Sequence, residues 1–353
     1  MPVWLIIAVT TAYVLGLFFI AWKGDNDAQN NPATKAPSGL CYALALAVYC
    51  TSWTYFGAVG TAVSAGWDYV WIYAGPALVF FFFPHVIRRI GDIAQRESIT
   101  SLSDFLSARY GKSRGVAMLA TFAAVTGSLP YIALQLKSVG LSLSAMAGNI
   151  ETTNESVLLT AIAMAAFAIF FGARHSDVTK HNRGLMHVLG FEAIIKLLAL
   201  MMVCALSITI VEGGMATIVQ DAQAHFGGYS LSGRAITFLL LSMAAVICLP
   251  RQFHVAIIER RDPKEVNWAR WIFPIYLILT SLVVVPIAMA GMSEYPTGVS
   301  PDLFVLKLPL GQGDGLCFVP DHGEHPAGGG VGQPSGDPFD AGRRGEGYRV
   351  APA

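Results

Sequence analysis

The sequence predicts an all-α, polytopic membrane protein with about eight transmembrane helices, and two observations carry this prediction. Of 353 residues, 54% are hydrophobic and only 13% are charged, and the mean hydropathy is +0.54. A surface that faces water does not tolerate this composition. The apolar residues also gather into runs of about 20, the length that a helix needs to cross a bilayer. The lipid bilayer is therefore the main expected partner, and we expect no enzyme activity.

The length rule places eight spans along the chain. The first has no basic residue ahead of it and no small-residue cleavage pattern behind it, so we expect it to stay as a span. Edges are set by the ends of the apolar runs. The predicted spans cover residues 2–22, 39–62, 69–90, 115–147, 156–173, 184–211, 234–258 and 271–291.

Basic residues alternate between the links that join the spans. The links after spans one, three, five and seven hold two, six, three and four Lys or Arg residues, where the six include Arg88 and Arg89 at the end of span three. Links 63–68, 148–155 and 212–233 hold none. By the positive-inside rule, the basic links are cytoplasmic and the amino terminus is outside. We expect a multi-pass protein of the bacterial inner (plasma) membrane. Within the last outer link, residues 215–226 could form a short amphipathic helix.

The charge balance and the cysteine and histidine spacing exclude two classes of site. With 23 basic and 23 acidic residues and no basic block, nucleic acid is not an expected partner. The five cysteines stand singly, and His175, His181 and His187 lie among basic residues that would repel a cation. The sequence therefore predicts no metal site and no organic cofactor.

Span two contains the most informative polar segment, residues 49–60, in which a block of hydroxyls is followed by two glycines. Such residues let a helix unwind locally, and carbonyls at membrane depth are tolerated unpaired where they line a cavity or bind an ion. Oxygen atoms of this kind would hold a hard cation such as sodium. Alternatively, the hydroxyls bond back to their own helix and the glycines allow close packing. The density of hydroxyls favours local unwinding.

Charged residues within spans four and six are functional candidates because charge is costly in a bilayer. Glu192 and Lys196 are four residues apart, so they could form a structural ion pair or take part in coupling. Lys137 lies near Gln135 and Tyr131, where it could meet an anionic group of a substrate or extend toward the outer surface.

Span seven places a helix breaker, a guanidinium and an imidazole close together, at Pro250, Arg251 and His254. This pattern is typical of an interrupted helix that lines a cavity. Alternatively, Arg251 extends to the cytoplasmic interface. The composition changes after about Leu308, because residues 309–353 contain 12 Gly and 6 Pro residues and no apolar run of spanning length. We expect a transmembrane domain over residues 1–308 and a disordered tail over 309–353.

Several blocks in shared order resemble the sodium/solute symporter family, which includes the bacterial proline and animal glucose cotransporters. These blocks are the end of the hydroxyl-and-glycine helix and two later stretches, residues 63–67, 99–110 and 250–270. Three segments look more like the branch of that family fused to sensor histidine kinases, residues 171–179, 191–197 and 249–255.

The resemblance implies an inverted five-plus-five helix repeat. Span one would be an extra leading helix, spans two to six the first repeat, and spans seven and eight the start of the second. The eighth core helix, which supplies hydroxyls to the sodium site in the family, would be missing. The resemblance therefore implies a truncated chain with an incomplete symporter domain over residues 1–308.

Carried over by position, the resemblance assigns an ion site and a solute site to the middle of span two. Tyr49 stands where some relatives carry an acidic residue, which leaves the identity of the ion open. The ion-binding candidates are Ala47, Cys50 and Thr51; the substrate-binding candidates are Ser52, Trp53, Thr54, Tyr131, Gln135 and Lys137; the further intramembrane polar candidates are Glu192, Lys196, Arg251 and His254.

The function implied is sodium-coupled symport of a small organic solute, an amino acid by resemblance, with sodium as the coupling ion. The alternative is the solute-sensing input domain of a two-component sensor histidine kinase. In that case the kinase lies outside this chain, and a kinase or response-regulator system is its partner.

Overall fold

The computed structural model describes residues 3–30, 39–146, 183–227 and 232–311, with four single residues between 158 and 165. Every regular element in this part of the chain is helical, which confirms the predicted all-α class. Predicted span 156–173, His175, His181 and the residues after 311 lie outside the described residues. The chain divides into two units, Met1–Cys317 and Phe318–Ala353, and all described residues belong to the first.

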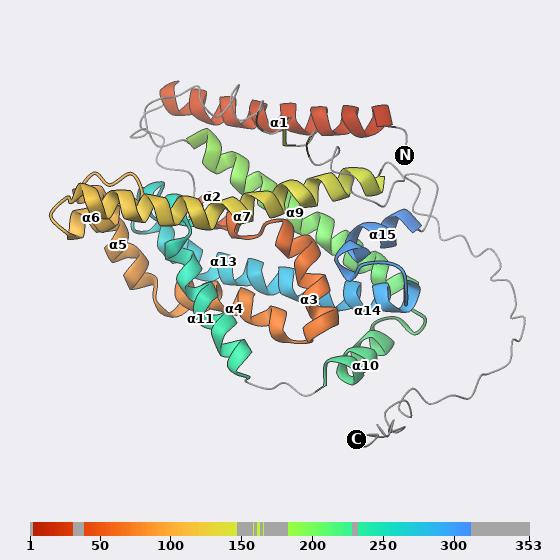
Figure 1. Cartoon of the computed structure of the whole chain (residues 1–353). Helices are drawn as coiled ribbons and strands as arrows, with labels where there is room; N and C mark the ends of the chain where they lie inside the picture. The colour runs from red at the N-terminus through yellow and green to blue at the C-terminus, as the bar shows by residue number, and fades with distance from the viewer. Residues whose placement is uncertain are drawn as a thin grey trace, which may run out of the picture. The chain divides into compact units, whose positions relative to one another are not determined.

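Figure 1 shows the helices of the described residues. They are α1 (Val3–Asn30), α2 (Gly39–Ala45), η1 (Leu46–Tyr49), η2 (Trp53–Gly57), α3 (Ala58–Ala65), α4 (Asp68–Phe82), α5 (Pro84–Arg96), α6 (Leu102–Arg109), α7 (Arg114–Met146), α9 (Arg183–Ile210), α10 (Gly214–Phe226), α11 (Gly233–Cys248), α12 (Pro250–Phe253), η4 (His254–Ile258), α13 (Glu265–Leu282), α14 (Val284–Glu294), η5 (Pro301–Leu303) and α15 (Phe304–Gly311).

Three of the described helical segments are long and apolar enough to cross a membrane, or up to six if each bent pair of helices is one span. The single segments are Arg114–Met146, Gly184–Ile210 and Glu265–Glu294. The six together coincide with all of the predicted spans except the first and the fifth. The first corresponds to α1, in which the apolar stretch is Ala8–Gly24.

Three of the predicted spans bend sharply. The two halves of span two meet at 71° and those of span seven at 57°, so the predicted unwinding and interruption are confirmed. Span three was expected as one helix over residues 69–90, but α4 and α5 meet at 75°. The turn lies at Phe83, because Pro84 has no N–H to donate and disfavours helical geometry in the residue before it.

Helix α13 lies at the centre of the bundle, where it packs against α2 and α4 (Figure 1). Helix α4 also packs against α11, and α9 packs against both α1 and α2. Gly75 of α4 allows the close approach to α11, since a Cβ atom there would overlap the side chain of Ser242. Span two is therefore held against α13 and span seven against α4, and these two helices pack against each other.

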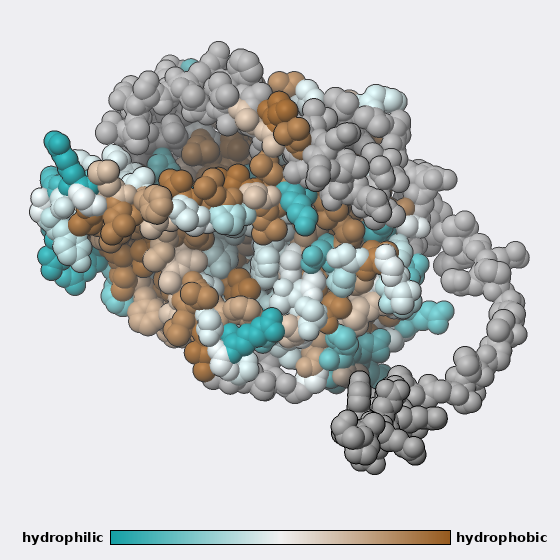
Figure 2. Space-filling view, in the orientation of Figure 1, coloured by the Kyte–Doolittle hydropathy of each residue, from teal (hydrophilic) through white to brown (hydrophobic). Residues whose placement is uncertain are grey.

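The outer surface of α7 and α11 is apolar (Figure 2). On α7, Met118, Leu119 and Phe122 are 73%, 70% and 70% exposed. A contiguous apolar surface of this kind is rare on soluble proteins and is typical of contact with lipid. Together with the apolar lengths of the helices, it indicates a membrane location.

Two contacts join segments near the ends of the helices. Arg260, in the basic link after η4, pairs with Asp92 of α5, and their atoms are 2.5 Å apart. Elsewhere, the ring of Trp67 lies 5.0 Å from that of Phe226 between centroids, which joins the link before α4 to the end of α10. The helix expected over residues 215–226 is present as α10.

Candidate functional site

The break in span two interrupts the backbone hydrogen bonds of the helix. The Cys50 N–H donates to the carbonyl of Ala47, three residues back, at 2.8 Å, and Cys50 itself is extended. After the break, the Thr54 N–H donates to the carbonyl of Thr51 at 2.9 Å. Ala47 is buried before the break, and Cys50, which is also buried, lies within the break together with Thr51. The three ion-binding candidates therefore surround one irregular stretch of backbone.

Glycine after the break makes room for a large aromatic side chain. A Cβ atom on Gly57 would overlap the indole of Trp53, one turn earlier. The indole ring packs 5.9 Å from the ring of Tyr73 on α4, measured between centroids. Thr54, beside it, is buried. Ser52, Trp53 and Thr54 thus lie at the start of the second half-helix, next to α4.

Helix α7 brings two of its three candidate residues to this break. The Ser52 N–H donates to Oε1 of Gln135 at 3.2 Å. Tyr131 lies one helical turn earlier on the same face, and its ring is 4.4 Å from the guanidinium carbon of Arg251. Span four therefore contacts both bent spans.

Lys137 lies on another face of α7, because two residues rotate a helix by about 200°. Its side chain is exposed. Desolvation raises the pKa of the Asp302 carboxyl above its usual value, and the positive charge of Lys137 opposes this shift. Lys137 therefore acts on Asp302 of η5, and Tyr131 and Gln135 are the span-four candidates that reach the break.

The break in span seven faces the break in span two. Leu249 is extended and Pro250 begins α12. The next side chains are Arg251, over Tyr131, and Gln252, which is fully buried and donates from Nε2 to the carbonyl of Leu46 at 3.4 Å. Gln252 was not among the predicted residues, although it follows Arg251 in the polar run after the helix breaker.

Four buried polar atoms around the two breaks have no hydrogen-bond partner among the described residues. They are Ser52 Oγ, Tyr131 OH, Gln135 Nε2 and Gln252 Oε1. Each such atom costs about 1–3 kcal/mol when it is left unpaired in the protein interior. Their convergence indicates groups that a bound molecule would satisfy.

The remaining intramembrane candidates, Glu192, Lys196 and His254, each have a polar partner close by. Lys196 Nζ lies 2.5 Å from Glu192 Oε1, which confirms the predicted proximity, and both side chains are 29% exposed. His254 Nε2 lies 3.2 Å from Glu259 Oε1. Both pairs fit a structural role, and a role of the Glu192 pair in coupling stays a prediction.

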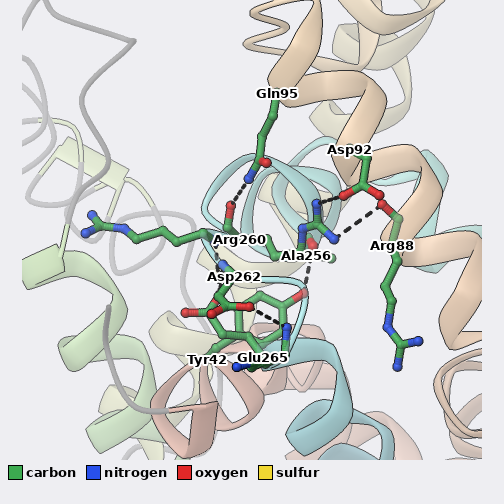
Figure 3. Close-up of polar contacts among 10 residues, drawn as sticks. Tyr42, Arg88, Asp92, Gln95, Ala256, Arg260, Asp262 and Glu265 are labelled. Atoms are coloured by element: carbon green, nitrogen blue, oxygen red, sulfur yellow. Dashed lines mark hydrogen bonds and ion pairs between the residues drawn. The ribbon is translucent and has the colours of Figure 1, made fainter. Parts of the chain in front are cut away.

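A second polar cluster joins the ends of α5, η4 and α13 (Figure 3). The Arg260 side chain is fully buried, pairs with Asp92 at 2.5 Å and donates to the carbonyl of Arg88 at 3.3 Å. Gln95 Nε2 donates to the carbonyl of Arg260 at 2.9 Å. Tyr42 of α2 donates to the carbonyl of Ala256 at 2.7 Å. The cluster therefore ties the second half of span seven to both α5 and α2.

A distant relative is named as a symporter. This protein of Bacillus subtilis (strain 168), called an uncharacterized symporter, YhjB, is 24% identical over 272 residues, which cover 74% of this chain. The chain spans about half of that relative, 53% of its length. No family model matches the chain, and no solved structure matches it. By its name that relative is a transporter, a class with which the apolar helices of this chain agree.

The donors at the break suit an alkali cation better than a transition metal. Within the described ranges, no group of three His, Cys, Asp or Glu side chains could hold a metal ion. The break instead offers the carbonyls of Ala47 and Cys50 and the hydroxyl of Thr51. Neutral oxygen atoms are the ligands that hard cations prefer.

Proposed function

We propose that this chain forms the membrane part of a sodium-coupled symporter that moves a small organic solute, an amino acid, across the bacterial inner membrane. The observation that carries the proposal is the meeting of two interrupted spans at their breaks, where Gln252 bonds to the carbonyl of Leu46. Interrupted helices of this kind offer backbone groups to solutes and ions at the middle of the membrane. The relative named as a symporter agrees with this class.

In this proposal the two sides of the span-two break have different ligands. Sodium binds the carbonyls of Ala47 and Cys50 with Thr51. The solute binds the start of the second half-helix, lined by Ser52, Trp53 and Thr54, together with Tyr131 and Gln135 of α7. Alternating access would then follow from movement of the half-helices about the breaks.

The topology and domain limits belong to the same proposal. Basic links are cytoplasmic, and the amino terminus is outside. The contacts of Arg260 with Asp92, and of Trp67 with Phe226, support this arrangement because they bring together links that the charge pattern assigns to one side. The membrane domain covers residues 1–308, followed by a tail, with α15 extending to Gly311.

Uptake of labelled amino acids by vesicles that contain the protein, with and without a sodium gradient, tests this function. We expect gradient-driven uptake that Ser52→Leu abolishes, because a bulky side chain fills the space beside the break. Ser64→Leu is the matched control, since Ser64 is exposed on the same half-helix and bonds back to the carbonyl of Gly60. Uptake indifferent to sodium, or equal loss in both variants, would contradict the proposal. Solute binding without uptake would favour the sensor alternative.

A further inference from the structure

We infer that the solute carries a carboxylate group and that Arg251 is the residue that binds it. The inference rests on the proposed function in taking the two breaks as a solute site, and it adds the group of the solute that is recognised and the residue that binds it. Three cationic side chains lie away from the ends of the predicted spans and are candidates for such a role, Lys137, Lys196 and Arg251. The structure separates them.

The two lysines differ from Arg251 in pairing or in exposure. Lys196 is paired with Glu192 at 2.5 Å. Lys137 is exposed, and its charge acts on Asp302. Arg251 is partly buried, and among the described residues its guanidinium contacts the ring of Tyr131 without an ion pair or a hydrogen bond. A ring face compensates a cation only in part, so Arg251 retains most of its capacity to bind an anion.

The contacts of Arg251 and its neighbours close a ring around the break in span two. Leu46 on one side of the break accepts from Gln252, which is adjacent to Arg251. Arg251 contacts Tyr131, and Gln135, on the same face of α7, accepts from the Ser52 N–H on the other side of the break. Three separate segments of the chain thus bring their polar groups to one place.

The unpaired atoms in this ring complement a carboxylate that has a hydrogen-bond donor beside it. Gln135 uses Oε1 to accept from Ser52, which leaves Nε2 as a free donor. Gln252 uses Nε2 to donate to Leu46, which leaves Oε1 as a free acceptor in a fully buried side chain. The hydroxyls of Ser52 and Tyr131 can each donate or accept a hydrogen bond. A guanidinium matches a carboxylate with two parallel hydrogen bonds, and the donor beside it, such as an amino group, would satisfy Gln252.

The ring itself contains no acidic side chain. Its members are Leu46, Ser52, Tyr131, Gln135, Arg251 and Gln252. The positive charge of Arg251 is therefore the formal charge that the ring presents to a ligand. A neutral sugar would satisfy the amides and hydroxyls but would leave that charge uncompensated, whereas a carboxylate neutralises it.

Ligand binding to the purified full chain tests the inference independently of transport. The probes are the common L-amino acids and, for each, the corresponding amino-acid amide, in which a neutral carboxamide replaces the carboxylate. Affinity is measured from the rise in melting temperature with ligand concentration, in sodium chloride and in choline chloride. We expect at least one amino acid to bind, and its amide to bind roughly 10-fold to 100-fold more weakly, the loss typical of a charged hydrogen-bonded pair.

Variants at two arginines assign the effect. Arg251→Gln should weaken binding of the amino acid by the same roughly 10-fold to 100-fold and remove the difference between the acid and its amide. Arg251→Lys keeps the positive charge but lacks the planar guanidinium, so this variant should bind the amino acid with intermediate affinity. It replaces Arg251→Gln in the test if the Gln variant does not fold. Arg234→Gln is the matched control, because Arg234 is an exposed residue of α11 paired with Asp68 at 3.2 Å.

Three results would overturn the inference. One is an amide that binds as tightly as its acid, a second is acid binding that Arg251→Gln and Arg251→Lys leave unchanged, and a third is the absence of binding by every carboxylate probe. Carboxylate binding that depends on Arg251, in a protein that shows no uptake, would support the inference and contradict the proposed transport.

Discussion

Replacing Asp92 by Asn should destabilise the helical bundle, because Arg260 would lose its only acidic partner among the described residues. The Arg260 side chain is fully buried, whereas that of Asp92 is 45% exposed, and their atoms are 2.5 Å apart. Removal of one partner of a fully buried pair costs about 3–5 kcal/mol. Asp92 is partly screened by solvent and Asn can still accept one hydrogen bond, so we expect a loss of about 2 kcal/mol in the free energy of unfolding.

The matched control for this substitution is Glu97→Gln, which makes the same acid-to-amide change near the end of α5. Glu97 pairs with Lys112 at 3.7 Å, and the two side chains are 51% and 73% exposed, so we expect a loss below about 0.5 kcal/mol. Unfolding in mixed detergent micelles, titrated with a denaturing detergent, measures both values. Equal effects of the two substitutions would refute the argument that burial of Arg260 makes its pair important.

Three further substitutions test the packing of the helices. Gly75→Ala should destabilise the protein by about 1–3 kcal/mol in the same unfolding assay, since the added Cβ overlaps the side chain of Ser242; no loss would show that α4 and α11 can separate without cost. Gly127→Ala in α7, where a Cβ meets no atom within 4 Å, should be neutral or stabilising by about 0.5–1 kcal/mol, and a loss would mean that this surface is packed. Tyr276→Phe should cost about 1 kcal/mol by removing the bond to the carbonyl of Ala193 at 3.0 Å, and a melting temperature equal to that of the wild type would contradict this.

Local chemistry allowed the interruptions of two spans to be predicted, but not the third. The hydroxyls and glycines of residues 49–60 indicated the break in span two, and Pro250 indicated the break in span seven. Pro84 has the same effect at the end of α4, yet it follows a run of phenylalanines that reads as the interior of a continuous apolar span. Composition alone placed span three over residues 69–90, whereas the two helices extend from Asp68 to Arg96, and it missed their turn of 75°.

The members of the candidate site could be predicted only in part, because they come together through tertiary packing. Gln252 contacts Leu46 across 206 residues, and Arg260 contacts Asp92 across 168. No local pattern specifies such pairings. The separation of Lys137 from Gln135 is different, since helical periodicity places them on different faces of α7. The sequence therefore contained the information that separates the two residues. They were grouped as candidates because they are close along the chain.

Amino-acid uptake into proteoliposomes, with sodium placed on one side only or at equal concentration on both sides, tests the account most directly. The account predicts that an inward sodium gradient drives accumulation above the external concentration, and that equal sodium abolishes this accumulation. Accumulation that is the same under both conditions, or equilibration that never exceeds the external concentration, would contradict sodium-coupled symport.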